Sequence, residues 1–259
     1  NTFSQPAGTY TVWTRDANNC STSTTITITQ PTQVTITRTA TAIACNGGNS
    51  TITVTGANGT PTYQYAIGAT PTFAVGNTFS QPAGTYTVWT RDANNCSTST
   101  TITITQPTQV TVSATNTAIL CNGNNSTITV TGANGTPTYQ YAIGATATFA
   151  VGNTFSQPAG TYTVWTRDVN NCSTSATITI TQPTQVTVSA TNTAILCNGN
   201  NSTITVTGAN GTPTYQYAIG ATPTFAVGNT FSQPAGTYTV WTRDANNCST
   251  STTITITKP

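Results

Sequence analysis

Apolar and polar residues alternate one by one along much of this chain. In the segment 126–131, Ile128 and Val130 fall on one face and threonines on the other, and Ile178 and Ile180 alternate in the same way within 173–181. A period of two places the apolar side chains on one face of a β-strand. No segment has a helical period, so the pattern predicts an all-β protein.

The same alternation predicts six or seven short strands in the stretch 108–183. Tyr139 and Tyr141 share a face of one strand, Phe149 and Val151 mark a short one, and Phe155 opens another. The longer strands are predicted at 110–113, 126–131, 138–143, 160–168 and 173–181. Asn134-Gly135 is a hairpin-type turn signal, and a second turn is expected at 169–171. Short strands separated by turns are typical of a Greek-key or immunoglobulin-like β-sandwich.

This pattern recurs with a period of 76 residues, because the string NTFSQPAGTYTVWTRD begins at Asn1, Asn77, Asn153 and Asn229. The best boundary between repeats follows each Gln-Pro pair. This boundary predicts an incomplete repeat at 1–31 and three complete β-sandwich repeats at 32–107, 108–183 and 184–259. The segment 1–31 holds only the last strands of a repeat. We therefore expect its apolar face to be completed by preceding chain or by another subunit.

The junction between repeats is short. Alternation continues in phase from residue 102 to residue 112, and only Pro107 intervenes. Proline holds an extended conformation and donates no ladder bond. A linker this short and stiff favours an arrangement of the tandem sandwiches as a rod.

Composition removes several classes of function. The chain has no His, no Glu and a single Lys, and each repeat offers one Asp beside an Arg. General acid–base or nucleophilic catalysis needs paired titratable groups, so we expect no enzyme and no cofactor. A net charge of +2 without a basic run argues against nucleic-acid binding. Asp92 with Asn94 and Asn95 could form a calcium loop, but an Asx turn explains the same residues.

Several motifs in fixed order resemble a known family. CNGNNSTITVTG begins at Cys121, TPTYQY at Thr136 and AGTYTV at Ala159, and RDVNNC ends at Cys172. Together with ITITQP ending at Pro183, they look like SprB-type repeats of the surface adhesins of gliding Bacteroidetes. The resemblance covers every repeat and the incomplete one. It implies a secreted or cell-surface filament, exported by the type IX system, that acts in adhesion or motility.

One strand departs from that family. Related repeats usually alternate Thr and Val after Gly-Thr-Tyr, whereas here the strand continues T-V-W-T-R-D. If Val88 faces the core, Trp89 and Arg91 face outward together and can stack as a cation–π pair. This Trp–Arg stripe predicts a lateral contact or ligand surface formed by Trp13, Arg15, Trp89, Arg91, Trp165, Arg167, Trp241 and Arg243. The alternative is that each Trp covers its own sheet or the neighbouring repeat.

Regularly spaced cysteines indicate disulfides in an oxidising compartment. The simplest pairing lies within repeats, as Cys45–Cys96, Cys121–Cys172 and Cys197–Cys248, which leaves Cys20 without its partner. The alternatives are a covalent link of the type Cys45–Cys172, which joins a repeat to the next one, and free thiols. Pairing of Cys96 with Cys121 is disfavoured, because an extended junction would separate them too far.

These observations favour a structural part of an extracellular or cell-surface filament or adhesin that supports adhesion, motility or matrix formation. Its expected partners are further copies or a longer chain, with no nucleic acid and no membrane span. A second hypothesis is a multivalent glycan-binding array that uses Trp89 and tyrosines. Short threonine rows leave ice binding as a third hypothesis.

Overall fold

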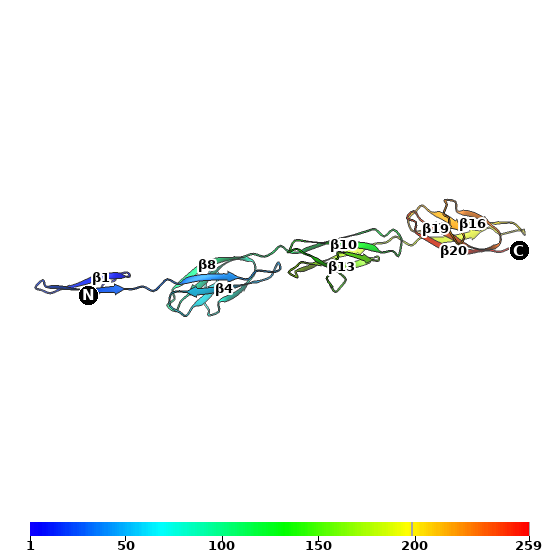
Figure 1. Ribbon diagram of the computed structural model, residues 1–259. Helices are drawn as coiled ribbons and strands as arrows, with labels where there is room; N and C mark the ends of the chain where they lie inside the picture. The colour runs from blue at the N-terminus through cyan, green and yellow to red at the C-terminus, as the bar shows by residue number, and fades with distance from the viewer. Residues whose placement is uncertain (198, 259) are drawn as a thin grey trace. The chain divides into compact units, whose positions relative to one another are not determined.

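The computed structural model describes residues 1–197 and 199–258. Within these ranges the chain forms twenty β-strands and no helix. Figure 1 shows the strands as arrows joined by loops. It divides into two compact units, Asn1–Thr108 and Gln109–Pro259. Each unit is described by itself.

The first unit contains a two-stranded hairpin followed by a sandwich of two three-stranded sheets. The hairpin pairs β1 (Gly8–Arg15) with β2 (Ser21–Ile28). One sheet of the sandwich has the order β3-β4-β6 and the other the order β5-β7-β8. These strands are β3 (Thr35–Ala40), β4 (Ser50–Ala57), β5 (Gln64–Ile67), β6 (Thr78–Gln81), β7 (Gly84–Arg91) and β8 (Ser97–Ile104).

The second unit contains two further sandwiches with the same order of strands. The first consists of β9 (Thr111–Asn116), β10 (Ser126–Ala133), β11 (Gln140–Ile143), β12 (Thr154–Gln157), β13 (Gly160–Arg167) and β14 (Ser173–Ile180). The second consists of β15 (Thr187–Asn192), β16 (Ser202–Ala209), β17 (Gln216–Ile219), β18 (Thr230–Gln233), β19 (Gly236–Arg243) and β20 (Ser249–Ile256). All pairings between these strands are antiparallel.

The strand order is that of an immunoglobulin-like sandwich. The first, second and fourth strands form one sheet, and the third, fifth and sixth form the other. Side chains from both sheets share one core, in which Val54 of β4 and Val88 of β7 have no exposed surface and Ile104 of β8 is 5% exposed. The other two sandwiches have equivalent cores. The predicted all-β, immunoglobulin-like fold class is confirmed.

A tyrosine at the start of the fifth strand fixes the corner that leads into it. The hydroxyl of Tyr86 donates a hydrogen bond to the carbonyl of Pro82 over 3.1 Å. The same bond links Tyr162 to Pro158 and Tyr238 to Pro234. This tyrosine corner is a hallmark of immunoglobulin-like domains. It is also present in the hairpin, where Tyr10 donates to the carbonyl of Pro6 over 3.0 Å.

The strands of 108–183 lie close to their predicted positions, with two differences. Phe149 and Val151 do not form a strand, because the only pairing there is a single bridge between Ala150 and Tyr141, and Val151 is 79% exposed. Asn134 and Gly135 adopt the predicted positive φ values of 59° and 62°, but they do not close a hairpin. Both edges of β10 are already paired, with β9 and β12, so the chain crosses to the opposite sheet.

Candidate functional site

Each repeat presents a turn built around one aspartate. In the last repeat, Oδ1 of Asp244 accepts hydrogen bonds from the N–H groups of Asn246 and Cys248, both over 2.9 Å. Its Oδ2 accepts the N–H of Thr212 over 2.9 Å. Asn247 has a φ of 65°, which asparagine tolerates better than most residues. The result is a closed Asx turn that presents Cys248 from its last position.

The same turn forms in the other copies, so it does not depend on its cysteine being bonded. In the hairpin, Asp16 accepts the N–H groups of Asn18 and Cys20. In the sandwich of the first unit, Asp92 accepts those of Asn94, Cys96 and Thr60. This arrangement is the Asx turn that the composition indicates.

Its hydrogen bonds also affect the acidity of Asp92. The bond from the Thr60 N–H lowers the pKa of Asp92 below its ordinary value, and those from Cys96 and Asn94 act in the same direction. Burial of the carboxyl group opposes them but does not reverse the shift. Within residues 1–197 and 199–258, no group of three metal-ligating side chains is assembled.

A second element of the site is the loop that carries the Cys-Asn-Gly motif. The side-chain amide of Asn122 donates to the carbonyl of Pro183 over 2.9 Å, and the N–H of Gly123 donates to Oε1 of Gln182 over 2.8 Å. Gly123 has a φ of +87°, a conformation that favours glycine. The last residues of a repeat therefore hold the cysteine-bearing loop of that repeat. We call this arrangement the Gln-Pro clamp.

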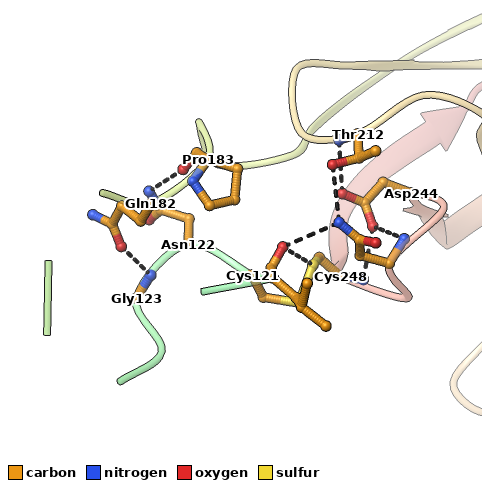
Figure 2. Close-up of a disulfide and its surroundings, with 10 residues drawn as sticks. Cys121, Asn122, Gly123, Gln182, Pro183, Thr212, Asp244 and Cys248 are labelled. Carbon is orange, nitrogen blue, oxygen red and sulfur yellow. Dashed lines mark hydrogen bonds between the residues drawn. A yellow bond between two sulfur atoms is a disulfide. The ribbon is translucent and has the colours of Figure 1, made fainter. Parts of the chain in front are cut away.

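The loop and the turn meet in a disulfide between Cys121 and Cys248, 127 residues apart in sequence, with a Cα–Cα distance of 5.4 Å. Figure 2 shows the loop with its clamp on one side and the Asp244 turn on the other. The side-chain amide of Asn246 adds a hydrogen bond of 3.4 Å to the carbonyl of Leu120. The disulfide thus joins the repeat 108–183 to the repeat 184–259.

This pairing corrects the expectation of disulfides within repeats. Cys121 does not bond Cys172, and Cys197 does not bond Cys248. The reason is geometric, because the clamp places the Cys121 loop beside the end of β14, whereas Cys172 directly precedes its start. Eight extended residues separate these two ends by roughly 25 Å, far beyond disulfide reach.

The remaining cysteines also differ from the predicted pairing within repeats. Cys20, Cys96 and Cys197 are free and exposed, so the predicted bonds of Cys96 and Cys197 are also wrong. Neither Cys45 nor Cys172 is a free thiol. The alternative from the sequence, a link from one repeat to the next, is the type that Cys121 and Cys248 form.

The residues of the predicted Trp–Arg stripe have partners inside their own sandwiches. The indole N–H of Trp89 donates to the carbonyl of Gly68 over 2.9 Å, and Nε of Arg91 donates to Oε1 of Gln64 over 2.8 Å. The guanidinium of Arg91 lies 4.4 Å from the ring centre of Phe73, so its cation–π partner is this phenylalanine rather than Trp89. The same contacts are made by Trp165, Arg167, Trp241 and Arg243.

The hairpin differs, because its Trp13 is 64% exposed. A ligand-binding role for the stripe stays a prediction. Sequence reasoning missed Gln182 and Phe73. The sequence did hold a signal for Gln182, because a Gln-Pro pair ends each of the segments 1–31, 32–107 and 108–183.

No protein-family model and no curated protein matches the chain. Among solved structures it is similar to the N-terminal eight Ig domains of the Down Syndrome Cell Adhesion Molecule, at 12% identity over 98% of this chain and 40% of that one, with a TM-score of 0.41. It is also similar to the extracellular cadherin domains 1–4 of Protocadherin Gamma B7, at 9% identity over 98% and 72% of the two chains, with a TM-score of 0.29.

A third similar structure is that of domains 4–9 of the surface layer protein SbsC, at 11% identity over 89% of this chain and 48% of that one, with a TM-score of 0.26. All three TM-scores are below 0.5, so the immunoglobulin-like assignment rests on the strand pairing and the shared cores. In the described part of the chain, no helix is long and apolar enough to cross a membrane.

Proposed function

We propose that this chain is a structural segment of an extracellular or cell-surface filament or adhesin of the SprB-repeat type. The observation that carries the proposal is the Cys121–Cys248 disulfide, which ties two consecutive repeats together. A protein that must transmit tension along its length gains from such a bond, because the residues between the two cysteines cannot be pulled out while it is closed. Disulfides also persist mainly in oxidising, extracellular environments.

The rest of the chain is consistent with a structural role. Each sandwich buries its own apolar core, so successive repeats can add length without changing their neighbours. The ionisable groups are few, and the carboxylates of Asp92 and Asp244 are occupied by backbone N–H groups. Those two carboxylates therefore hold turns in place and offer no acid–base pair for catalysis.

Single-molecule stretching of the oxidised chain tests the mechanical part of the proposal. In a background with Cys45→Ser and Cys172→Ser, which removes the other bonded cysteines, the disulfide joins positions 127 residues apart and should remove roughly 400 Å from the fully extended contour length. The paired variant Cys121→Ser with Cys248→Ser should recover this length, and Cys197→Ser is the matched control that should leave it unchanged. Equal contour lengths for the oxidised chain and the paired variant would remove the mechanical role.

Localisation is tested separately in the organism that makes the protein. Antibodies to the repeat should label intact, non-permeabilised cells or the material shed from them. Electron microscopy of that material should show fibres with an axial period of one repeat. Labelling confined to the cell interior, or isolated monomers without fibres, would contradict the proposal.

A further inference from the structure

The sandwich 108–183 holds an arginine whose outer end has no partner. Nε of Arg167 donates to Oε1 of Gln140 over 2.8 Å, and its guanidinium lies 4.5 Å from the ring centre of Phe149. Within the part of the chain that the structure describes, its terminal nitrogens donate no hydrogen bond and form no ion pair. The side chain is therefore fixed along its length, while its terminal N–H groups stay available.

The arginine borders an open hollow on the surface of the sandwich. The hollow lies where β13 ends and the Asx turn begins, beside the start of β11. Its volume is about 270 Å³, and it is lined by Thr138, Gln140, Arg167, Asp168, Val169 and Asn171. Pockets for drug-sized ligands are usually larger, so this hollow suits a single small unit.

Groups that can donate hydrogen bonds gather around the hollow. Because arginine only donates, the oxygen of the Gln140 amide must face Arg167, and the NH₂ group of that amide is left unbonded. The hydroxyl of Thr138 and the side-chain amide of Asn171 also make no hydrogen bond to any other described residue. A ligand that fits the hollow must therefore supply acceptors.

Among the lining residues, Asp168 alone is acidic. Its Oδ1 accepts the N–H groups of Asn170 and Cys172, and its Oδ2 accepts that of Thr136, each over 3.0 Å. These bonds engage the carboxylate with the backbone of the turn, so it leaves the guanidinium unpaired. Its charge still opposes an incoming anion, and a single site should therefore bind weakly.

The arrangement recurs in the other two complete sandwiches. Arg91 and Arg243 donate to Gln64 and Gln216 over 2.8 Å, and each guanidinium stacks on a phenylalanine. The threonine and the asparagine of the lining are present in both repeats as well. A ligand that itself repeats along a polymer would meet several equivalent sites on one chain, and avidity would strengthen weak binding.

We infer that the hollow at Arg167 binds the carboxylate of an acidic sugar, and that the repeats together bind a polyuronate. A guanidinium pairs with a carboxylate through two parallel hydrogen bonds, for which its free terminal end is suited. Thr138 and Asn171 are then placed to bond ring hydroxyls, which a glutamate side chain lacks. The inference goes beyond the proposed structural role, and its failure would leave that role standing because the site uses no cysteine side chain.

The test measures binding of the whole chain to immobilised polygalacturonate by biolayer interferometry. The controls are the same polysaccharide after reduction of its carboxyl groups, and polyglutamate. The chain should bind polygalacturonate about tenfold more tightly than either control, which is the effect of one hydrogen bond to a charged group. Absence of binding to polygalacturonate, or equal binding to either control polymer, overturns the inference.

Substitutions separate the site from the effect of net charge. Arg167→Gln should weaken binding by about tenfold. The matched control is Arg38→Gln, which removes the same charge from an exposed side chain of β3 and should leave binding unchanged. Arg167→Lys keeps the charge but loses the planar end, so it should weaken binding as well. Equal effects of Arg167→Gln and Arg38→Gln would show that only net charge matters.

A second measurement does not depend on how the variants fold. In NMR spectra of the unaltered chain, galacturonate should shift the side-chain signals of the Gln140 NH₂ group and the Arg167 Nε–H group in a saturable way. Neutral galactose should leave both signals in place. If galacturonate shifts neither signal, or shifts them no more than galactose does, the sugar does not occupy this hollow.

Discussion

The side-chain carbonyl of Gln182 accepts the N–H of Gly123 over 2.8 Å, and this bond ties the end of a repeat to the loop that carries its cysteine. Gln106 holds Gly47 in the same way, also over 2.8 Å. In the last repeat the equivalent residue is Lys258, whose side chain donates hydrogen bonds but accepts none. The loop of Cys197 therefore lacks this part of the clamp.

Changing Gln182 to Lys should loosen the Cys121 loop. The Gly123 N–H would lose its acceptor, at a cost of about 1 kcal/mol in the free energy of unfolding. Amide hydrogen exchange of Gly123, followed by NMR, should become faster. The reverse change, Lys258→Gln, should slow exchange at Gly199. Equal exchange rates in both variants and the parent would show that the clamp does not restrain the loop.

Opening the disulfide should destabilise the second unit. The bond between Cys121 and Cys248 restricts the unfolded chain over 127 residues, so Cys121→Ser with Cys248→Ser should lower the free energy of unfolding by about 3 kcal/mol. Denaturant unfolding of the variant under oxidising conditions measures this loss. A reductant should lower the stability of the parent by more than that of the paired variant, in which Cys45 and Cys172 remain bonded until they are reduced.

The sandwich of the first unit should lose stability in acid through Asp92. Because its folded-state pKa lies below the ordinary value, folding favours the carboxylate. The resulting stability is complete above the unfolded-state pKa and is lost as the pH falls through the folded-state pKa. Denaturant unfolding at a series of pH values should show a smaller loss in acid for Asp92→Asn than for the parent. Parallel curves would contradict this role for the carboxylate.

Changing Gly56 to Ala should disturb the contact between the two sheets. A Cβ atom there would lie 2.6 Å from Oγ1 of Thr90 and 3.0 Å from the ring of Tyr63. Thr90 is fully buried, so the overpacking should cost about 2 kcal/mol in the free energy of unfolding. The control is Gly76→Ala, because a Cβ at Gly76 meets no atom within 4 Å. Equal stabilities of the two variants would argue against close packing at Gly56.

The indole N–H of Trp89 should contribute to stability rather than only to a binding surface. Trp89→Phe removes its bond to Gly68 and should cost about 1 kcal/mol in denaturant unfolding. Trp13→Phe is the matched control, with an expected effect below about 0.5 kcal/mol because Trp13 is largely exposed. Similar losses in both variants would mean that the bond to Gly68 is not the cause.

The strands were predictable because their signal is local. Ile128 and Val130 alternate with threonines whatever the rest of the chain does, and both are fully buried. The turn at Asn134 and Gly135 was predictable as a backbone conformation, but not as a crossing between sheets. Which strand the chain meets after that turn depends on the neighbours of β10, and these come from distant parts of the sequence.

The candidate site was harder to predict, because its contacts join distant segments. The choice between Cys172 and Cys248 as the partner of Cys121 depends on which end of β14 the loop occupies. The Gln182–Gly123 hydrogen bond places the Cys121 loop at the C-terminal end of β14, and the spacing of the cysteines in the sequence does not indicate this bond. In the same way, the sequence places Arg91 two residues after Trp89, yet Phe73 reaches Arg91 from a different segment.

The direction of the Cys121–Cys248 bond has a consequence for how such a chain can change its length. Each repeat offers one cysteine to its successor, from the loop, and one to its predecessor, from the turn. Duplication or deletion of a whole repeat therefore creates no new unmatched cysteine. Unequal recombination between near-identical copies can lengthen or shorten the chain without any compensating mutation, and the number of free thiols, three in this chain, stays the same.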